Sequence, residues 1–162
     1  HAYWEPLNQS SRGLDAEISG SLTDRWQVYA GYTFNRSTNR NSVTGNVESR
    51  RKGYNFSSHT PKHMFRLYTS YILPIDDGKW TVGLGVKSSS KTANSYGSIK
   101  QGGYTVWNTN VQYRPSKNLQ LGLAVNNLTD KRYYENQYSR AANSSNFYGE
   151  PRNAVFSLKW KM

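Results

Sequence analysis

The sequence predicts an all-β protein, an antiparallel transmembrane β-barrel of which this chain supplies about seven strands. Three observations lead to this prediction. Apolar and polar residues alternate with period two in segment after segment. Short turns and long polar loops alternate between those segments, as they do in membrane barrels. Aromatic residues gather near the segment ends, where a ring can be half apolar and half hydrated.

The alternation defines the elements in order along the chain. In the first, Leu14, Ala16 and Ile18 alternate with Asp15 and Glu17, and the later segments follow the same rule. About 9–11 tilted residues cross a bilayer, which these lengths allow. The predicted strands lie near 12–22, 26–38, 62–74, 79–91, 103–114, 119–129 and 152–161.

The long loops are all predicted on the same side of the membrane. Short turns are predicted at 23–25, 75–78 and 115–118, and long polar loops at 39–61, 92–102 and 130–151. If the last strand ends on the periplasmic side, the first runs inward from outside. An odd number of strands does not close a bacterial barrel, so we expect a piece of a larger one.

The aromatic residues favour a membrane protein over a soluble sandwich. Trp26, Tyr71, Trp80 and Tyr113 lie near the short turns, and Tyr104 and Trp107 near a long loop. Such girdles are typical of the two membrane interfaces.

Composition excludes several classes of protein. The 162 residues include 21 Lys plus Arg and 10 Asp plus Glu, a net charge of +11, and no Cys. Disulfide scaffolds and thiolate chemistry are therefore excluded. The chain opens without a leader or a Met, which suggests a fragment, and no apolar run is long enough for a transmembrane helix. The basic residues are spread through loops and strand ends, and no compact basic patch is evident from the sequence.

No pattern supports catalysis. Nucleophile elbows and phosphate-binding loops are missing, and Asp76-Asp77-Gly78 is typical of a hairpin turn. Gly83-x-Gly85 lies inside a strand, without the helix of a dinucleotide site. His59 and His63 have a spacing that suits a metal on a helix, but Pro61 argues against one. We expect neither an enzyme nor a metal site.

Several motifs resemble those of TonB-dependent outer-membrane receptors. The most specific is Val125-Asn-Asn-Leu-Thr-Asp-Lys-Arg-Tyr133, similar to the family's V-x-N-L-x-D-K-x-Y signature. Tyr148-Gly-Glu-Pro-Arg-Asn153 resembles the segment before its final strand. The alternation that closes the chain resembles the signal read by the barrel-assembly machinery, although Met162 stands where an aromatic is usual. Further matches are Arg12–Trp26 with Ala30–Phe34, Thr60–His63, and Gly103–Asn108 with Val111–Arg114.

The resemblance implies a barrel of about 22 strands with an N-terminal plug and a TonB-binding box. Residues 1–162 would be the C-terminal segment of that barrel, with the plug and the box absent. It also implies TonB-dependent uptake of ferric siderophores, of the hydroxamate or pyoverdine kind, across the bacterial outer membrane. Iron would arrive already chelated, so no cofactor is expected. The implied partners are the ferric siderophore, TonB through its box, outer-membrane lipid and lipopolysaccharide, and the barrel-assembly machinery, without nucleic acid.

Ligand contacts are expected in the loops. Tyrosine rings there can pack on a bulky chelate, and arginines can bond its charged groups. A basic segment with Arg40, Arg50, Arg51 and Lys52 attracts either an anionic chelate or lipopolysaccharide phosphates, or is simply solvated. The candidate siderophore contacts are Tyr54, Tyr96, Tyr138, Arg140, Tyr148 and Arg51.

Other conspicuous residues have a structural interpretation. Asn127 and Asp130 are expected to bond nearby backbone where a strand becomes a loop. Gly149 is expected to supply an unusual φ, and Pro151 to suit the start of a strand.

Alternative functions remain open. The chain can belong to another outer-membrane barrel: a porin, an adhesin, or a receptor for haem, cobalamin or a glycan. A soluble nucleic-acid-binding β domain would use the +11 charge and the aromatics, and a carbohydrate-binding sandwich would need no detergent.

Overall fold

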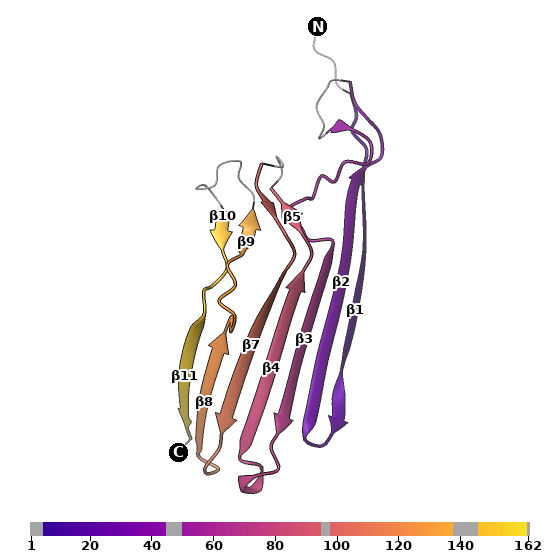
Figure 1. The fold of residues 1–162 in the computed structure, drawn as a ribbon. Helices are drawn as coiled ribbons and strands as arrows, with labels where there is room; N and C mark the ends of the chain where they lie inside the picture. The colour runs from indigo at the N-terminus through magenta and orange to yellow at the C-terminus, as the bar shows by residue number, and fades with distance from the viewer. Residues whose placement is uncertain (1–4, 45–49, 95–97, 138–145, 162) are drawn as a thin grey trace.

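One seven-stranded antiparallel sheet makes up most of the computed structural model, which describes residues 5–44, 50–94, 98–137 and 146–161. The strand order is β1-β2-β3-β4-β7-β8-β11, a meander that follows the chain (Figure 1). β1 and β11 are its edges, and the described strands do not pair these edges with each other. The predicted all-β antiparallel fold is confirmed.

The strand boundaries agree with the alternation to within three residues. The long strands are β1 Gln9–Thr23, β2 Trp26–Asn39, β3 His63–Ile72, β4 Trp80–Ser89, β7 Tyr104–Tyr113, β8 Leu119–Asn126 and β11 Asn153–Trp160. β8 ends earlier than predicted because Asn127 has a φ of 52°, which lies outside the extended region.

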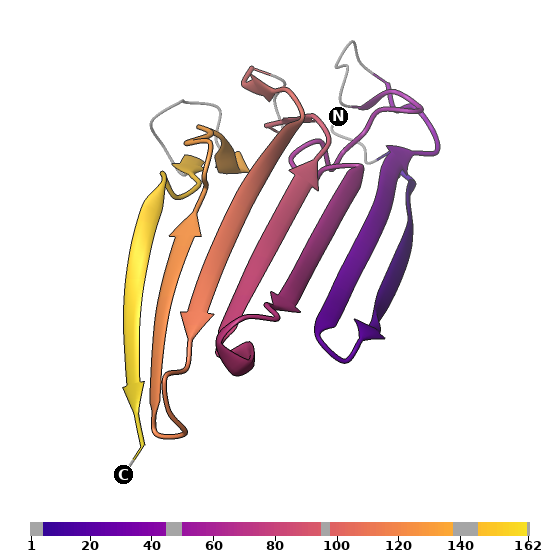
Figure 2. The same ribbon diagram turned by 60° about the horizontal axis from the view of Figure 1, so that its bottom comes forward.

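The connections separate into two ends of the sheet, as predicted. Figures 1 and 2 show the short turns and the C-terminus at one end, here called the turn end, and the long connections at the other, the loop end. At the turn end a short 3-10 turn, Asp76–Gly78, joins β3 to β4, so this acidic pair belongs to a turn.

Two of the predicted loops contain small hairpins that the sequence did not reveal. β5 Thr92–Ala93 pairs with β6 Lys100–Gln101, and β9 Tyr134–Gln137 pairs with β10 Asn146–Tyr148. These strands have two to four residues, too few for an alternating pattern to be recognised. Among the described residues, no helix is long and apolar enough to cross a membrane.

One face of the sheet is apolar across its width. A single row runs through Ile18, Ala30, Leu67, Val86 and Trp107, each opposite the next on the neighbouring strand. No described segment covers this face, and Ile18 has 71% of its surface exposed. A continuous apolar surface of this kind requires lipid or protein against it.

The opposite face, here called the inner face, is polar. The neighbouring row contains Glu17, Gly31, Arg66 and Lys87, each opposite the next. Since successive residues of a strand point to opposite faces, the sheet separates an apolar from a charged environment. That is the arrangement of a membrane barrel wall, with lipid outside and a polar lumen.

Aromatic residues border the apolar face at the turn end. Trp26 meets Tyr71 edge to face, with ring centroids 6.3 Å apart, and Trp80 stacks on Tyr113 at 4.3 Å. The four residues predicted for this girdle therefore lie together in pairs.

The prediction for the other girdle was wrong in one residue. Trp107 lies on the apolar face, opposite Val86. Tyr104 stands three positions away, opposite Ser89, and strand alternation therefore places it on the inner face.

Candidate functional site

The long connections are joined to one another at the loop end. The backbone amide of Ala93 in β5 donates to the carbonyl oxygen of Ser58, at 2.9 Å. The side chain of Gln101 in β6 donates to the carbonyl oxygen of Tyr134 in β9, at 3.1 Å, and accepts from the amide of the same residue at 2.5 Å. All three connections therefore form one hydrogen-bonded layer.

Two stacked tyrosine pairs lie in this layer. Tyr104 stacks on Tyr133, and Tyr134 stacks on Tyr148, each with ring centroids 4.4 Å apart. The hydroxyl of Tyr148 donates to that of Tyr134 at 2.9 Å. The guanidinium carbon of Arg132 lies 4.4 Å from the centre of the Tyr148 ring, a cation–π contact.

The two pairs differ in exposure, and this decides what each can do. Tyr133 is 9% exposed, whereas Tyr148 is 49% exposed. Burial raises the pKa of Tyr133, and the nearby carboxylates of Glu135 and Glu150 raise it further. The buried pair is thus a neutral structural contact, while Tyr148 offers ring surface and a hydroxyl beside a cation.

Asn127 holds the base of this layer together. Its side-chain nitrogen donates to the carbonyl oxygens of Lys131 and Glu150, both at 2.9 Å, and its side-chain oxygen accepts from the amide of Lys131 at 2.8 Å. Asp130 accepts from the amide of Arg152 at 2.9 Å. The structural interpretation of the Asn-Leu-Thr-Asp-Lys segment is confirmed.

Gly149 is needed for a reason other than the one predicted. Positive φ angles among the described glycines occur at Gly53 and Gly78, not at Gly149. A Cβ on Gly149 would instead lie 2.0 Å from the Cζ atom of Tyr133. The glycine makes room for the buried ring, and the prediction of an unusual φ was wrong.

A small polar cavity lies on the inner-face side of the layer. It has a volume of about 90 Å³, and its lining includes Lys87, Glu135 and Gln137. The ammonium of Lys87 and the carboxylate of Glu135 are 3.7 Å apart. Gln137 is 3% exposed and accepts a hydrogen bond from Thr92 at 2.7 Å, but its side-chain nitrogen has no hydrogen-bond partner among the described residues. Within that part of the chain, the cavity therefore offers a buried donor to an oxygen atom.

The predicted ligand contacts do not form one group in the described residues. Tyr148 joins Tyr134 and Arg132, whereas Tyr54 and Arg51 belong to the connection that folds back on the end of β2. There the carbonyl oxygen of Tyr54 accepts from the backbone amide of Asn39 at 3.0 Å. The other predicted contacts, Tyr96, Tyr138 and Arg140, lie outside the described residues.

Sequence reasoning missed three residues of this site: Arg132, Tyr134 and Gln137. The adjacent Arg132-Tyr133-Tyr134 was a usable signal, because tyrosine and arginine are both enriched at binding surfaces. Nothing in the sequence pointed to Gln137, since its significance comes from burial alone.

The two histidines considered as metal ligands lie in different surroundings. His63 is on the apolar face, where its Nδ1 atom and the hydroxyl of Tyr32 are hydrogen-bonded at 2.7 Å. His59 lines the small polar cavity.

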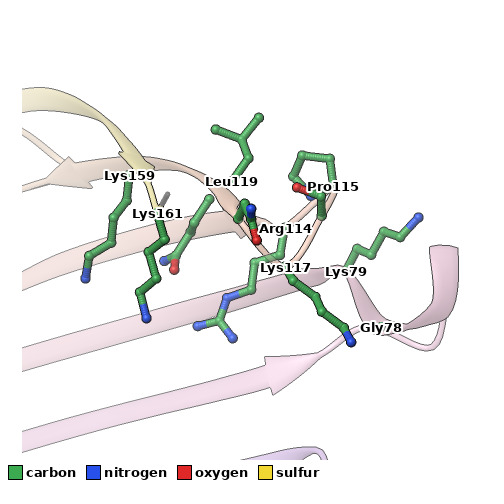
Figure 3. Close-up of a pocket in the computed structure, with 11 residues that line it drawn as sticks. Gly78, Lys79, Arg114, Pro115, Lys117, Leu119, Lys159 and Lys161 are labelled. Atoms are coloured by element: carbon green, nitrogen blue, oxygen red, sulfur yellow. The ribbon is translucent and has the colours of Figure 1, made fainter.

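A second group of charged residues lies at the turn end. An open hollow of about 730 Å³ is lined by five cations from three segments (Figure 3): Lys79, Arg114, Lys117, Lys159 and Lys161. The sequence showed no compact basic patch, but the fold forms one here. Residues far apart in the sequence converge here because antiparallel strands bring their turns to one end.

The sequence of the chain is similar to that of known outer-membrane receptors. A family model described as "TonB dependent receptor-like, beta-barrel" matches residues 5–128. The ferric-pyoverdine M114 receptor PbuA of Pseudomonas sp. (strain M114) is 36% identical over 155 residues, which cover 92% of this chain and 18% of that protein. The probable TonB-dependent siderophore receptor PiuA of Acinetobacter baumannii is 32% identical over 160 residues, covering 92% of this chain and 20% of PiuA.

Solved structures show the same relationship. The pyoverdine outer membrane receptor FpvA of Pseudomonas aeruginosa PAO1, bound to pyoverdine, superposes with a TM-score of 0.75 at 30% identity, over 96% of this chain and 22% of that one. The siderophore receptor PiuA from A. baumannii gives a TM-score of 0.72 at 27% identity, over 95% of this chain and 22% of that one. The chain thus spans about a fifth of the length of the proteins it matches.

Proposed function

The chain belongs to the TonB-dependent receptor β-barrel family, and we propose that it forms part of the wall and mouth of an outer-membrane receptor for ferric siderophores. The seven-stranded sheet is a fragment of a larger barrel. The observation that carries the proposal is the pairing of an apolar face with the exposed Tyr148–Tyr134–Arg132 group at the loop end.

In this proposal the apolar face contacts outer-membrane lipid and the inner face lines the lumen. Phe34 lies eight positions after Trp26 on the apolar face of β2. That is about 27 Å along a strand, or about 21 Å across the membrane at a tilt of 40°. This height agrees with an apolar band of about 25 Å. The turn end would face the periplasm, and the loop end the outside.

We further propose that residues 1–162 form the C-terminal segment of the barrel. The plug and the TonB-binding box would belong to other parts of the receptor, and TonB would act through that box. The barrel-assembly machinery would insert the barrel by its last strand. Lipopolysaccharide would contact its outer surface.

The bound substrate would be a ferric siderophore of the hydroxamate or pyoverdine kind. Several curated relatives are named as ferric-pyoverdine receptors, which supports this choice. Tyr148 would pack on the chelate, Arg132 would face its negative charge, and the free nitrogen of Gln137 would donate to one of its oxygens. Tyr54, Tyr96, Tyr138, Arg140 and Arg51 stay as proposed additional contacts. Iron enters as chelated substrate, and no reaction or cofactor is involved.

Uptake of siderophore-bound radioactive iron tests this proposal in cells that produce the full-length receptor. Uptake of a hydroxamate or pyoverdine chelate is expected, and it should stop when TonB is removed. Uptake of the complex without TonB would favour a porin. Uptake of haem, cobalamin or a glycan in place of the chelates would assign another substrate to the same barrel.

A further inference from the structure

Two arginines face each other across the first hairpin. Arg12 in β1 lies directly opposite Arg36 in β2, and both are exposed. Like charges directly opposite on antiparallel strands destabilise the pair. The arrangement is therefore expected where an anion sits between the two cations.

The pair lies on the apolar face. Leu14 is opposite Phe34 on that face, and Arg12 and Arg36 follow two positions further toward the loop end. Because side chains alternate with period two, the arginines point to the same side as these apolar residues. This side is turned away from the inner face and from the tyrosine layer.

The height of the pair corresponds to lipid headgroups. Tyr32, Phe34 and His63 form the aromatic group at the loop end of the apolar face, with Phe34 and His63 ring centroids 5.2 Å apart. Arg36 lies two residues beyond Phe34. That separation is about 7 Å along the strand, or about 5 Å across the membrane at a 40° tilt. The polar layer occupies about the first 6 Å beyond the hydrocarbon core on each side.

The following loop adds two more cations. Asn39 is 2% exposed, and its side chain donates to the carbonyl oxygen of Arg51 at 3.2 Å. The amide of Gly53 donates to the carbonyl oxygen of Asn39 at 2.9 Å. This fold-back brings Lys52 into an open hollow of about 530 Å³ that also contains Arg36.

The lining of this hollow suits phosphate. It combines cations with hydroxyl donors, namely Arg12, Arg36, Arg40, Lys52, Ser10 and Thr38. No carboxylate lines it among the residues that the structure describes. Arginine's planar guanidinium bonds phosphate through two nitrogens, so a facing pair of arginines can hold one phosphate from both sides.

We propose that Arg12 and Arg36, with Arg40 and Lys52, bind the phosphate group of an anionic lipid in the outer leaflet. The inference rests on the proposed function for the orientation of the sheet in the membrane. It goes further in assigning a defined lipid-phosphate site to a surface separate from the tyrosine layer.

Native mass spectrometry of the full-length receptor in detergent tests the site, with a diphosphorylated lipid A as the probe. Arg12→Gln with Arg36→Gln should weaken lipid binding roughly tenfold to a hundredfold, because two charge-assisted contacts are lost. Arg12→Lys with Arg36→Lys should retain a large part of the binding. Arg114→Gln with Lys117→Gln, at the turn end, removes the same charge and should leave binding unchanged.

Three results would overturn the proposal: unchanged lipid binding by the double glutamine variant, equal binding of a dephosphorylated lipid A, or displacement by inorganic phosphate at the lipid's own concentration. The last would identify a site for free anions. Ferric-siderophore binding, measured on the same samples, should survive in the glutamine variant. A wild-type receptor that binds the lipid but no siderophore would contradict the proposed function and still support the lipid-phosphate site.

Discussion

Replacing Asn127 is expected to open the base of the loop-end layer. Its side chain is 2% exposed and makes three hydrogen bonds to the backbone of Lys131 and Glu150. Alanine removes all three, at about 0.5–1.5 kcal/mol each. The backbone φ of 52° adds about 1 kcal/mol for alanine, which adopts this region less readily than asparagine. The expected loss is about 3–5 kcal/mol of local stability.

Hydrogen exchange of the full-length receptor measures this loss at the Lys131 amide, which donates to the Asn127 side chain at 2.8 Å. Since about 1.4 kcal/mol corresponds to a factor of ten, exchange should accelerate roughly a hundredfold to several thousandfold in Asn127→Ala. Asn127→Asp keeps the acceptor but sets a buried carboxylate oxygen against the carbonyl oxygens of Lys131 and Glu150, so its exchange should be at least as fast as that of Asn127→Ala. Asn118→Ala, in an exposed turn, is the matched control. Exchange within threefold of wild type in Asn127→Ala, on the order of 0.7 kcal/mol, would refute this reasoning.

Three further predictions concern the same layer. Gly149→Ala should displace the Tyr133 ring and cost about 1–3 kcal/mol of local stability, seen as faster amide exchange in β10. Gly102→Ala, whose Cβ meets no atom of the described residues within 4 Å, should not. Burial raises the pKa of the Tyr133 hydroxyl. The neutral ring therefore stabilises the folded layer fully below the ordinary tyrosine pKa of about 10, and this stabilisation is lost as pH rises through the raised pKa of the folded state. Near-ultraviolet circular dichroism should show this loss in wild type and a smaller one in Tyr133→Phe; identical profiles would contradict it. Removing residues 130–151 should weaken siderophore binding while the barrel still assembles, and unchanged affinity would exclude this loop from the site.

The strands and the two faces were predictable because a sheet converts sequence parity directly into orientation. Ile18 and Glu17 had to face opposite sides whatever the rest of the fold, and they do. The turn at Asp76–Gly78 was equally local.

What was missed depends on register and on contacts between distant segments. The opposition of Arg12 and Arg36 requires the register of the hairpin, and the space filled beside Gly149 requires the position of Tyr133. Tyr148 was recognised by residue type, but its stacking partner comes from another strand of a hairpin too short to predict.

Binding of a ferric siderophore to the detergent-purified full-length receptor tests the central claim most directly. Trp and Tyr fluorescence should be quenched on titration with a panel of ferric hydroxamates and pyoverdines. We predict saturable quenching by at least one chelate, weakened in Tyr148→Ala and Arg132→Ala and unchanged in Arg114→Gln. A folded receptor that responds to none of the chelates would contradict the assignment of this barrel to ferric-siderophore uptake.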